Sequence, residues 1–362
     1  PLKAPVIVFR VDGDRVRGMG HLSNCFNLAL LCRDTLGAKA HFLLLQSSLH
    51  NTFVQWIEAA GFGVATVSGD QPWSEDLETT ASRIEALHPD FLIADLITAD
   101  ATDLDLLDSS RIELPQVEWY VDWLRRFRRP VISLSHDAEP ISYCPDLLVA
   151  LHPLQLSMDY KDGARRLLGP RYHTPAPAFR PFRHRTRLHP QQGRHVVLAF
   201  GGSDPDQLTL RVAGALAPLP DLEITAVLGP ATACEPPLVD HLRRLGARPV
   251  HAVQDLAQIL WNCDLAISAG GNMVFELASL GTPAMVINIR QRQQLNTAWF
   301  ASHGACIDLG TGSDIEDREL RQQLLSTLAD RRRRQALSNA GRAVVDGRGG
   351  ERVVAALNEL AA

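Results

Sequence analysis

His21 is well placed for acid–base chemistry, because it follows a Gly18-Met-Gly20 turn and begins an apolar segment typical of a helix. The hydrophobic run Val6–Phe9, typical of a buried strand, comes before it. Open α/β sheets bind ligands at the carboxyl ends of their strands, and helix N-termini attract anions. An imidazole there can act as a general base beside a phosphorylated ligand. We predict that His21 is catalytic and that Gly18 and Gly20 bind the ligand; the alternative is a histidine that only caps or packs the helix.

Two aspartates are candidates to support this histidine. Asp12 lies between the first expected strand and the glycine turn, and Asp137 follows a second expected strand, Val131–Ser135. A carboxylate in either place can orient the loop or the imidazole. We therefore predict that Asp12 and Asp137 belong to the catalytic group, and for Asp12 the alternative is an aspartate that caps a turn.

Two glycine pairs in the second half of the chain stand between an expected strand and an expected helix. Gly201-Gly202 follows the strand-like run His195–Phe200, and Gly270-Gly271 follows Leu265–Ser268. Glycine lets the backbone approach a ligand closely, and backbone amides before a helix can hold phosphates. A Gly-Gly-Ser sequence by itself is also a common turn. The residues that we predict to bind phosphates here are Gly201, Gly202, Ser203, Gly270, Gly271 and Asn272.

Two further polar residues are placed to contact the rest of a nucleotide. Glu276 lies about one helical turn after Gly271, where its carboxylate can reach a ribose diol; the alternative is a capping-box partner of Asn272. Gln293 belongs to the polar segment Gln291–Asn296, which directly follows an expected strand. Polar residues at a strand end often face a cleft, and the alternative is an exposed polar loop. We predict that Glu276 and Gln293 bind the ligand.

The elements that must position these residues alternate between strand-like and helix-like segments along the chain. This rhythm predicts an α/β protein with two doubly wound, Rossmann-like domains that face each other across a cleft. We expect an N-terminal domain over 1–175 and a linker rich in proline, arginine and histidine over 176–194. A nucleotide-sugar-binding domain over 195–345 and a C-terminal helix over 346–362 complete the chain. Within the second domain, the spacing predicts one continuous helix over 315–340.

Composition excludes several classes of function. The chain has 362 residues, of which 46% are hydrophobic and 21% charged, and its net charge is −5. These values are typical of a globular protein, and no basic stripe indicates a nucleic-acid partner. The longest apolar runs have strand length and no signal-peptide pattern is present, so we expect a cytoplasmic protein. Cysteines and histidines lack metal-ligand spacing, and no Gly-x-Gly-x-x-Gly or Gly-Lys-Ser/Thr loop occurs, so we expect no metal and no cofactor.

In combination and in order, these motifs resemble those of the nucleotide-sugar hydrolases of the pseudaminic-acid pathway and their relatives in spore-coat polysaccharide biosynthesis. The resemblance covers nearly the whole chain and implies the two-domain GT-B fold, which these proteins share with the glycosyltransferase that completes lipid II. The matching segments are Arg10-Val-Asp12, Gly18-Met-Gly-His21, Asp137, Cys144-Pro-Asp-Leu-Leu148, Leu168-Gly-Pro-Arg-Tyr172, Gly201-Gly-Ser-Asp-Pro205, Ser268-Ala-Gly-Gly271, Glu276, Leu280-Gly-Thr-Pro283, Gln293 and Asp346-Gly-Arg-Gly349.

The resemblance implies an enzyme that removes UDP from an acetamido-deoxy-sugar by attack of water at the anomeric carbon. The product would serve bacterial surface-glycan biosynthesis of the nonulosonic-acid kind. In this scheme His21 is the base, and the second glycine loop and Glu276 form the UDP-binding region. The substrate is a UDP-sugar or another NDP-sugar.

Three positions depart from the family pattern. Asn24 stands where arginine is usual, Leu96 or Ile97 where tyrosine is usual, and Asn272-Met273 where a serine/threonine pair is usual. The first two lie in the catalytic half and favour an alternative, a GT-B glycosyltransferase that passes the sugar to a hydroxyl acceptor. Membrane association is expected only if that acceptor is a lipid. A non-catalytic sugar-nucleotide binder is the third possibility.

Overall fold

A computed structural model describes most of the chain and divides it into two compact units. The described residues are 4–11, 19–45, 51–67, 73–96, 117–135, 145–160, 163–202, 204, 206–230, 232, 234–251, 253, 255–289, 291–312 and 314–361. The first unit comprises Pro1–Thr174 together with Gly350–Ala362, and the second comprises Pro175–Gly349. The C-terminal residues therefore return to the first unit.

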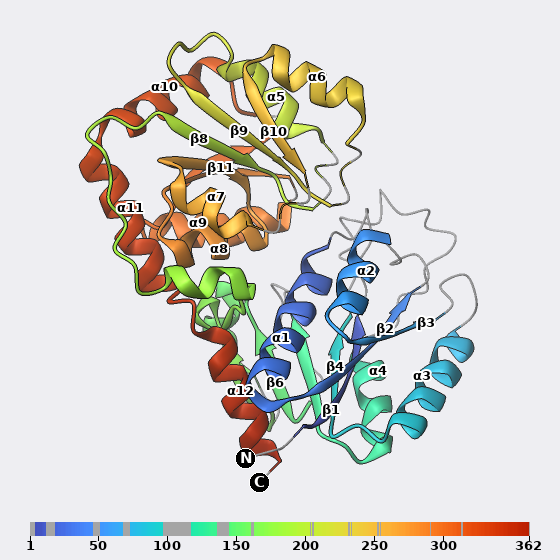
Figure 1. The fold of residues 1–362 in the computed structure, drawn as a ribbon. Coiled ribbons are helices and arrows are strands. Elements are labelled where there is room, and N and C mark those ends of the chain that lie inside the picture. The colour runs from blue at the N-terminus through green and yellow to red at the C-terminus, as the bar shows by residue number, and fades with distance from the viewer. Residues whose placement is uncertain are drawn as a thin grey trace. The chain divides into compact units, whose positions relative to one another are not determined.

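The first unit is built on a seven-stranded sheet in the order β3-β2-β1-β4-β5-β6-β7, in which paired strands are parallel (Figure 1). Its strands are β1 (Val6–Val11), β2 (Lys39–Leu45), β3 (Gly63–Val67), β4 (Phe91–Asp95), β5 (Val131–Ser135), β6 (Leu147–Ala150) and β7 (Arg165–Leu168). Most of these strands are predominantly apolar, as expected where helices cover both faces of a parallel sheet.

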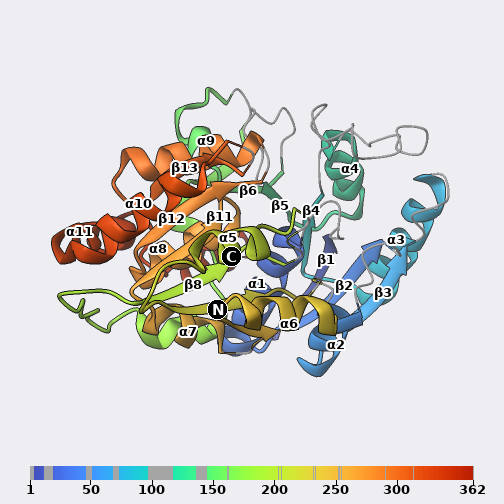
Figure 2. The same cartoon turned by 90° about the horizontal axis from the view of Figure 1, so that it is seen from above.

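Helices cover the two faces of this sheet, with α1 and α2 on one side and α3 and α4 on the other (Figure 2). Along β1 and β4, Val8, Leu92 and Ala94 join the core formed with α3 and α4. Because side chains alternate along a strand, the intervening residues face α1. The helical elements of the unit are α1 (Gly20–Leu36), α2 (Asn51–Ala59), α3 (Trp73–Leu87), α4 (Val117–Leu124), α12 (Gly349–Leu360) and the 3-10 helices η3 (Arg125–Phe127), η4 (Pro153–Ser157) and η5 (Pro170–Tyr172).

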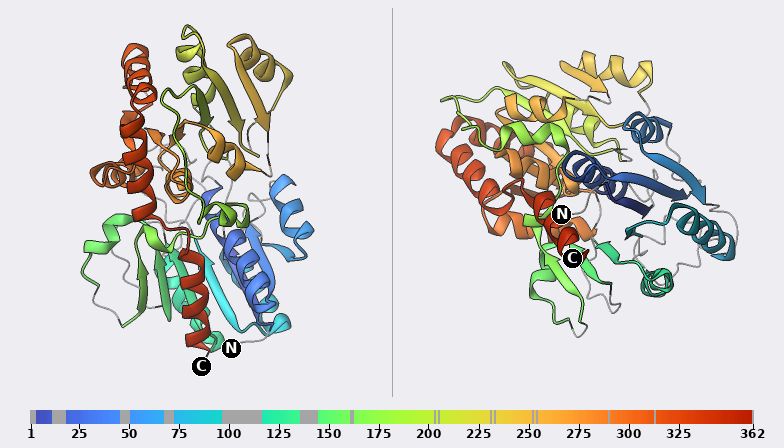
Figure 3. Two further views of the ribbon diagram at one scale, coloured as in Figure 1. Left: turned by 60° about the vertical axis from the view of Figure 1, so that its left-hand side comes forward. Right: turned by 60° about the horizontal axis from the view of Figure 1, so that its bottom comes forward.

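The last helix, α12, packs within the first unit (Figure 3). Its residues Val353 and Leu357 are buried. At its surface, Arg352 donates a hydrogen bond to a backbone carbonyl oxygen just after β7, at Arg171 (2.8 Å). A salt bridge of 2.5 Å joins Glu359 to β7. These contacts attach the C-terminal helix to the edge of the sheet that is formed by β6 and β7.

The second unit contains a six-stranded parallel sheet in the order β10-β9-β8-β11-β12-β13. Its strands are β8 (His195–Ala199), β9 (Glu223–Leu228), β10 (Ala247–His251), β11 (Leu265–Ala269), β12 (Ala284–Asn288) and β13 (Ile307–Thr311). Its helical elements are η6 (Pro177–Phe182), α5 (Leu208–Leu216), α6 (Pro236–Arg244), α7 (Leu256–Asn262), α8 (Asn272–Leu280), α9 (Gln291–Ser302), α10 (Asp317–Ala329) and α11 (Arg331–Val344).

The prediction of one helix over 315–340 is wrong, because the chain breaks between α10 and α11. Asp330 stands at the break with extended backbone (φ −99°, ψ 94°), and its carboxylate accepts a hydrogen bond from the Arg333 amide at 3.0 Å. An aspartate that caps a following helix ends the preceding one, even where the apolar spacing continues across it.

The strand order reverses at one point in each sheet, and this point places the candidate site residues. In the first unit β1 lies between β2 and β4, and in the second β8 lies between β9 and β11. The carboxyl ends of β1 and β4 are therefore neighbours, as are those of β8 and β11, and such switch points bind ligands in open α/β sheets. The predicted α/β class with two Rossmann-like sheets is confirmed.

No helix in the described ranges is long and apolar enough to cross a membrane.

Candidate functional site

His21 and Asp95 form a short hydrogen-bonded pair at the switch point of the first sheet. His21 is the second residue of α1, and Asp95 is the last residue of β4. The imidazole Nδ1 lies 2.6 Å from Asp95 Oδ1. The carboxylate is fully buried and the histidine is 8% exposed. An ionised carboxylate holds the imidazole proton on Nδ1, so that Nε2 is the nitrogen able to take a proton from a reacting group.

The same carboxylate has a second neighbour on α1. The Sγ atom of Cys25 lies 3.7 Å from Asp95 Oδ2, so both carboxylate oxygens face this helix. Burial raises the pKa of the Cys25 thiol well above its ordinary value, and the nearby Asp95 charge raises it further. Cys25 is therefore a neutral thiol at physiological pH.

Sequence reasoning missed Asp95 as the partner of His21. It proposed Asp12 and Asp137 instead, and these two residues lie outside the described part of the chain, as does Gly18. Gly20 is the first residue of α1. An indication was present: Asp95 ends the apolar run Phe91–Ala94, and an acidic residue at the end of a buried parallel strand points toward the ligand edge of a sheet.

Arg10 belongs to the opposite face of the sheet and has a structural partner. Its guanidinium forms a buried ion pair with Asp76 of α3, at 2.7 Å between Nη2 and Oδ2. The other oxygen of Asp76 accepts a hydrogen bond from the Tyr120 hydroxyl of α4 at 2.9 Å. This cluster ties β1 to the two helices behind the sheet.

The loop between β11 and α8 carries the second glycine pair of the second unit, Gly270-Gly271. Gly271 occupies the N-cap position of α8, where it offers no side chain to cap the helix. A Cβ atom on Gly270 would lie 2.3 Å from Asn288 Oδ1 and 2.5 Å from Thr297 Oγ1, so glycine is required there. The Asn296 amide nitrogen donates to the Gly270 carbonyl oxygen at 3.0 Å. These contacts with β12 and α9 hold the loop in place.

Gln293 and Glu276 lie on the two helices that flank this loop. Gln293 Oε1 accepts a hydrogen bond from the Ile289 amide at 2.9 Å, and its Nε2 lies 3.7 Å from the place of a Cβ atom on Gly271. Glu276 is half-buried on α8, and burial raises its pKa to about 7. Asn272 is the first residue of α8. An amide donor, a helix N-terminus and a carboxyl group thus belong to one region of the second unit.

The loop after β8 differs, because a carboxylate already occupies the N-terminus of its helix. Asp204 accepts hydrogen bonds from the Leu208 and Thr209 amides of α5, each at 2.9 Å. Gly201 has a φ of +87°, which favours glycine. Gly202 follows in the same turn, and Ser203 lies outside the described residues. Phosphate binding by Gly201, Gly202 and Ser203 stays a prediction. The first turn of α8, in contrast, contains no acidic residue.

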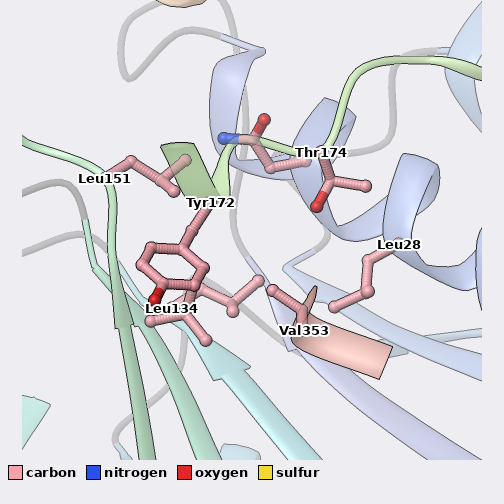
Figure 4. A pocket seen from close by; sticks show the side chains of 8 residues that line it. Leu28, Leu134, Leu151, Tyr172, Thr174 and Val353 are labelled. Carbon is pink, nitrogen blue, oxygen red and sulfur yellow. The ribbon is translucent and has the colours of Figure 1, made fainter. Parts of the chain in front are cut away.

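A small apolar cavity lies one helical turn from His21 in the first unit (Figure 4). Its volume is about 20 Å³, room for one water-sized group. Asn24 of α1 and Thr174 contribute polar atoms to a lining that is otherwise mostly aliphatic. The lining residues are Asn24, Leu28, Leu134, Val149, Leu151, Tyr172, Thr174 and Val353.

Among the described residues, no group of three or more His, Cys, Asp or Glu side chains could hold a metal ion.

The chain is similar to proteins of glycosyl transfer and of polysaccharide biosynthesis. The model of the glycosyltransferase family 28 C-terminal domain matches residues 192–347, which include both glycine loops, Glu276 and Gln293. The spore coat polysaccharide biosynthesis protein SpsG of Bacillus subtilis (strain 168) is 30% identical over 235 residues, covering 64% of this chain and 69% of SpsG.

Solved structures with the same fold include glycosyltransferases of low sequence identity. MurG from Acinetobacter baumannii has a TM-score of 0.65 at 15% identity, covering 98% of this chain and 100% of MurG. The spinosyn rhamnosyltransferase SpnG, complexed with thymidine diphosphate, has a TM-score of 0.62 at 18% identity, with 98% and 100% covered. At these identities the likeness shows the fold, which is the GT-B fold of two Rossmann-like domains.

Proposed function

The chain belongs to the family of the spore coat polysaccharide biosynthesis protein SpsG, and from this premise we propose that it cleaves the bond between sugar and diphosphate in a nucleotide-linked sugar. The coarse assignment is a glycosyltransferase-like protein of polysaccharide biosynthesis. The finer proposal is a hydrolase that releases UDP from an acetamido-deoxy-sugar, for a bacterial surface glycan of the nonulosonic-acid kind. The observation that carries the reaction is the His21–Asp95 pair.

In the proposed reaction, His21 activates water. The water oxygen attacks the anomeric carbon, the bond from that carbon to the diphosphate oxygen breaks, and His21 Nε2 takes the water proton. Asp95 keeps the proton on Nδ1 and stabilises the imidazolium that forms, since its charge lies 2.6 Å away. Asp12 and Asp137 remain proposed supporting residues of the same group.

The leaving nucleotide is proposed to bind at the β11–α8 loop. Amides of Gly270, Gly271 and Asn272, at the N-terminus of α8, would take the negative charge that develops on the diphosphate. Glu276 would accept hydrogen bonds from the ribose diol, and Gln293 would donate to the ligand from α9. The proposed chemistry requires no metal, because backbone amides and the helix dipole carry the charge.

A transferase is the second candidate, and the match to the glycosyltransferase family 28 C-terminal domain favours it. The same imidazole would then remove the proton from a hydroxyl group of an acceptor instead of from water. Membrane association is proposed only for the case in which that acceptor is a lipid.

Incubation of the protein with UDP- and CMP-linked amino-sugars, without an acceptor, tests the proposal. Phosphorus NMR follows release of the nucleotide. Release of UDP with free sugar by the wild type, lost in His21→Ala and kept in His184→Ala, supports a hydrolase; His184 is an exposed histidine of the second unit. Binding without release contradicts hydrolysis and indicates a transferase or a binding protein.

A further inference from the structure

Cys25 is a buried group at the candidate site that the proposed reaction does not yet use. It lies four residues after His21 on α1, so the two side chains project from the same face of the helix. His21 Nδ1 contacts one oxygen of Asp95 at 2.6 Å, and Cys25 Sγ contacts the other at 3.7 Å. Both the thiol and the carboxylate are fully buried.

We propose that Cys25 is a positioning residue for the base, in which its S–H group donates a hydrogen bond to Asp95 and so fixes the carboxylate against His21. The proposal deepens the proposed function, because it rests on His21 as the base. With an oxygen bound at each side by one helix, the plane of the carboxylate cannot rotate without breaking a contact. The raised pKa of the thiol keeps it protonated and thus a donor.

A thiol can act here because its S–H group is a hydrogen-bond donor. A buried carboxylate needs hydrogen bonds to remain ionised. The thiol supplies one to Oδ2, while Oδ1 contacts His21. The Asp95 carboxyl, from β4, contacts both the His21 imidazole and the Cys25 thiol, which come from α1. Arg10 projects from the other face of β1 and is bound to Asp76.

A set of three variants tests the proposal. Cys25→Ala removes the donor, Cys25→Ser keeps a donor of similar size, and Cys32→Ala is the matched control. Cys32 is also fully buried on α1, and burial alone accounts for its raised pKa. The readouts are the pH titration of the His21 imidazole by NMR, assigned with His21→Gln, and the dependence of nucleotide release on pH.

We expect Cys25→Ala to raise the pKa of His21, because the carboxylate oxygen that loses its donor carries more charge. Release should slow by about 2- to 10-fold, the range for loss of one hydrogen bond. Cys25→Ser should recover most of the rate, and Cys32→Ala should resemble the wild type in both readouts. The proposal is wrong if Cys25→Ala leaves the titration unchanged, if Cys25→Ser fails to recover the rate, or if Cys32→Ala has the same effect as Cys25→Ala.

Infrared spectroscopy of the thiols needs neither activity nor a destabilising variant. The difference between wild type and Cys25→Ser isolates the S–H stretching band of Cys25, and the difference between wild type and Cys32→Ser gives that of Cys32. A Cys25 band at lower wavenumber than the Cys32 band supports the hydrogen bond to Asp95, and coincident bands contradict it. If His21→Ala retains full activity, the proposed function fails, while the band positions and the His21 titration still decide the role of Cys25.

Discussion

At the residue scale, the proposed chemistry depends on where the imidazole of His21 carries its proton. Asp95 faces Nδ1 at 2.6 Å and is fully buried, so the ion pair that forms when His21 accepts a proton is poorly screened by solvent. Local sequence placed the histidine at a helix start, but its partner comes from a strand 74 residues away.

We therefore expect Asp95→Asn to slow nucleotide release by about 100- to 10,000-fold, the range for general base catalysis, because an amide does not stabilise the imidazolium by charge. Release is measured at saturating substrate, with circular dichroism as the control for folding. A rate close to that of the wild type would show that Asp95 does not assist the base.

A second residue-scale prediction concerns Glu276 and pH. Burial raises the pKa of its carboxyl to about 7, so the neutral acid predominates below that pH and the carboxylate above it. Ribose hydroxyls donate more strongly to the carboxylate, and UDP affinity should therefore rise as the pH rises through about 7. Calorimetry over this interval measures it. Glu276→Gln is the control, because it removes the titrating carboxyl group while the phosphate groups of UDP still titrate. An identical pH dependence of UDP affinity in both proteins would refute the role of Glu276.

The same raised pKa has a consequence for stability. A carboxyl whose pKa is higher in the folded state than its ordinary 4.5 favours folding only in the neutral form. Its contribution is present below about 4.5 and is lost as the pH rises through about 7. Glu276→Gln should thus weaken the pH dependence of unfolding in this interval.

At the element scale, parallel strand order assembles each group of site residues. β1 and β4 are neighbours although β2, β3 and three helices separate them along the chain, and β8 and β11 have the same relation. Elements with weak patterns were the ones that sequence reasoning missed. β7 begins with two arginines, and β13 includes Asp308 and Gly310, so neither is a clear apolar run. For such segments, pairing with a neighbouring strand determines whether a strand forms.

Gly270→Ala tests the close packing of the β11–α8 loop. The new Cβ atom would meet Asn288 Oδ1 at 2.3 Å and must displace the loop or break its contacts. We expect UDP affinity to fall by about 10-fold or more, as for the loss of hydrogen bonds to a charged group. Gly214→Ala is the matched control, because nothing lies within 4 Å of its Cβ position in α5. It should leave affinity unchanged and raise stability slightly, since alanine favours a helix more than glycine does.

The buried cluster behind β1 makes a prediction about folding. Asp76→Asn would remove the negative charge that lies 2.7 Å from the buried Arg10 guanidinium, and this should lower the free energy of unfolding by about 3–5 kcal/mol. Chemical denaturation measures the loss. Asp34→Asn removes a more exposed ion pair with Arg33 in the same unit and should cost about 1 kcal/mol or less. Equal effects of the two substitutions would contradict a special role for the buried pair.

At the scale of the whole molecule, the proposed base and the nucleotide-binding candidates belong to different units. His21 lies in the first unit, and Gly270, Glu276 and Gln293 lie in the second. Each unit has its own parallel sheet and positions its own group of side chains. This division matches the two-domain organisation of the GT-B fold and predicts that binding and chemistry can be separated by mutation.

We expect His21→Ala to keep the UDP affinity of the wild type while nucleotide release falls by orders of magnitude. Glu276→Ala should lower UDP affinity by about 10-fold or more, because the variant loses a charged hydrogen-bond acceptor. Calorimetry with UDP and the release assay measure the two effects on the same preparations. Loss of UDP affinity in His21→Ala would show that the two functions are not divided between the units in this way.

The sequence by itself determined the α/β class, most of the strands, the helix start at His21 and the two glycine loops, because these depend on apolar periodicity and on local backbone requirements. The tertiary structure decided which residues meet. It joined Asp95 and Cys25 to His21, packed Asn288, Asn296 and Thr297 around Gly270, and returned α12 to the first unit. The physical reason is that strand order and helix packing are long-range: they depend on which apolar faces are buried together, and spacing along the chain does not record that choice.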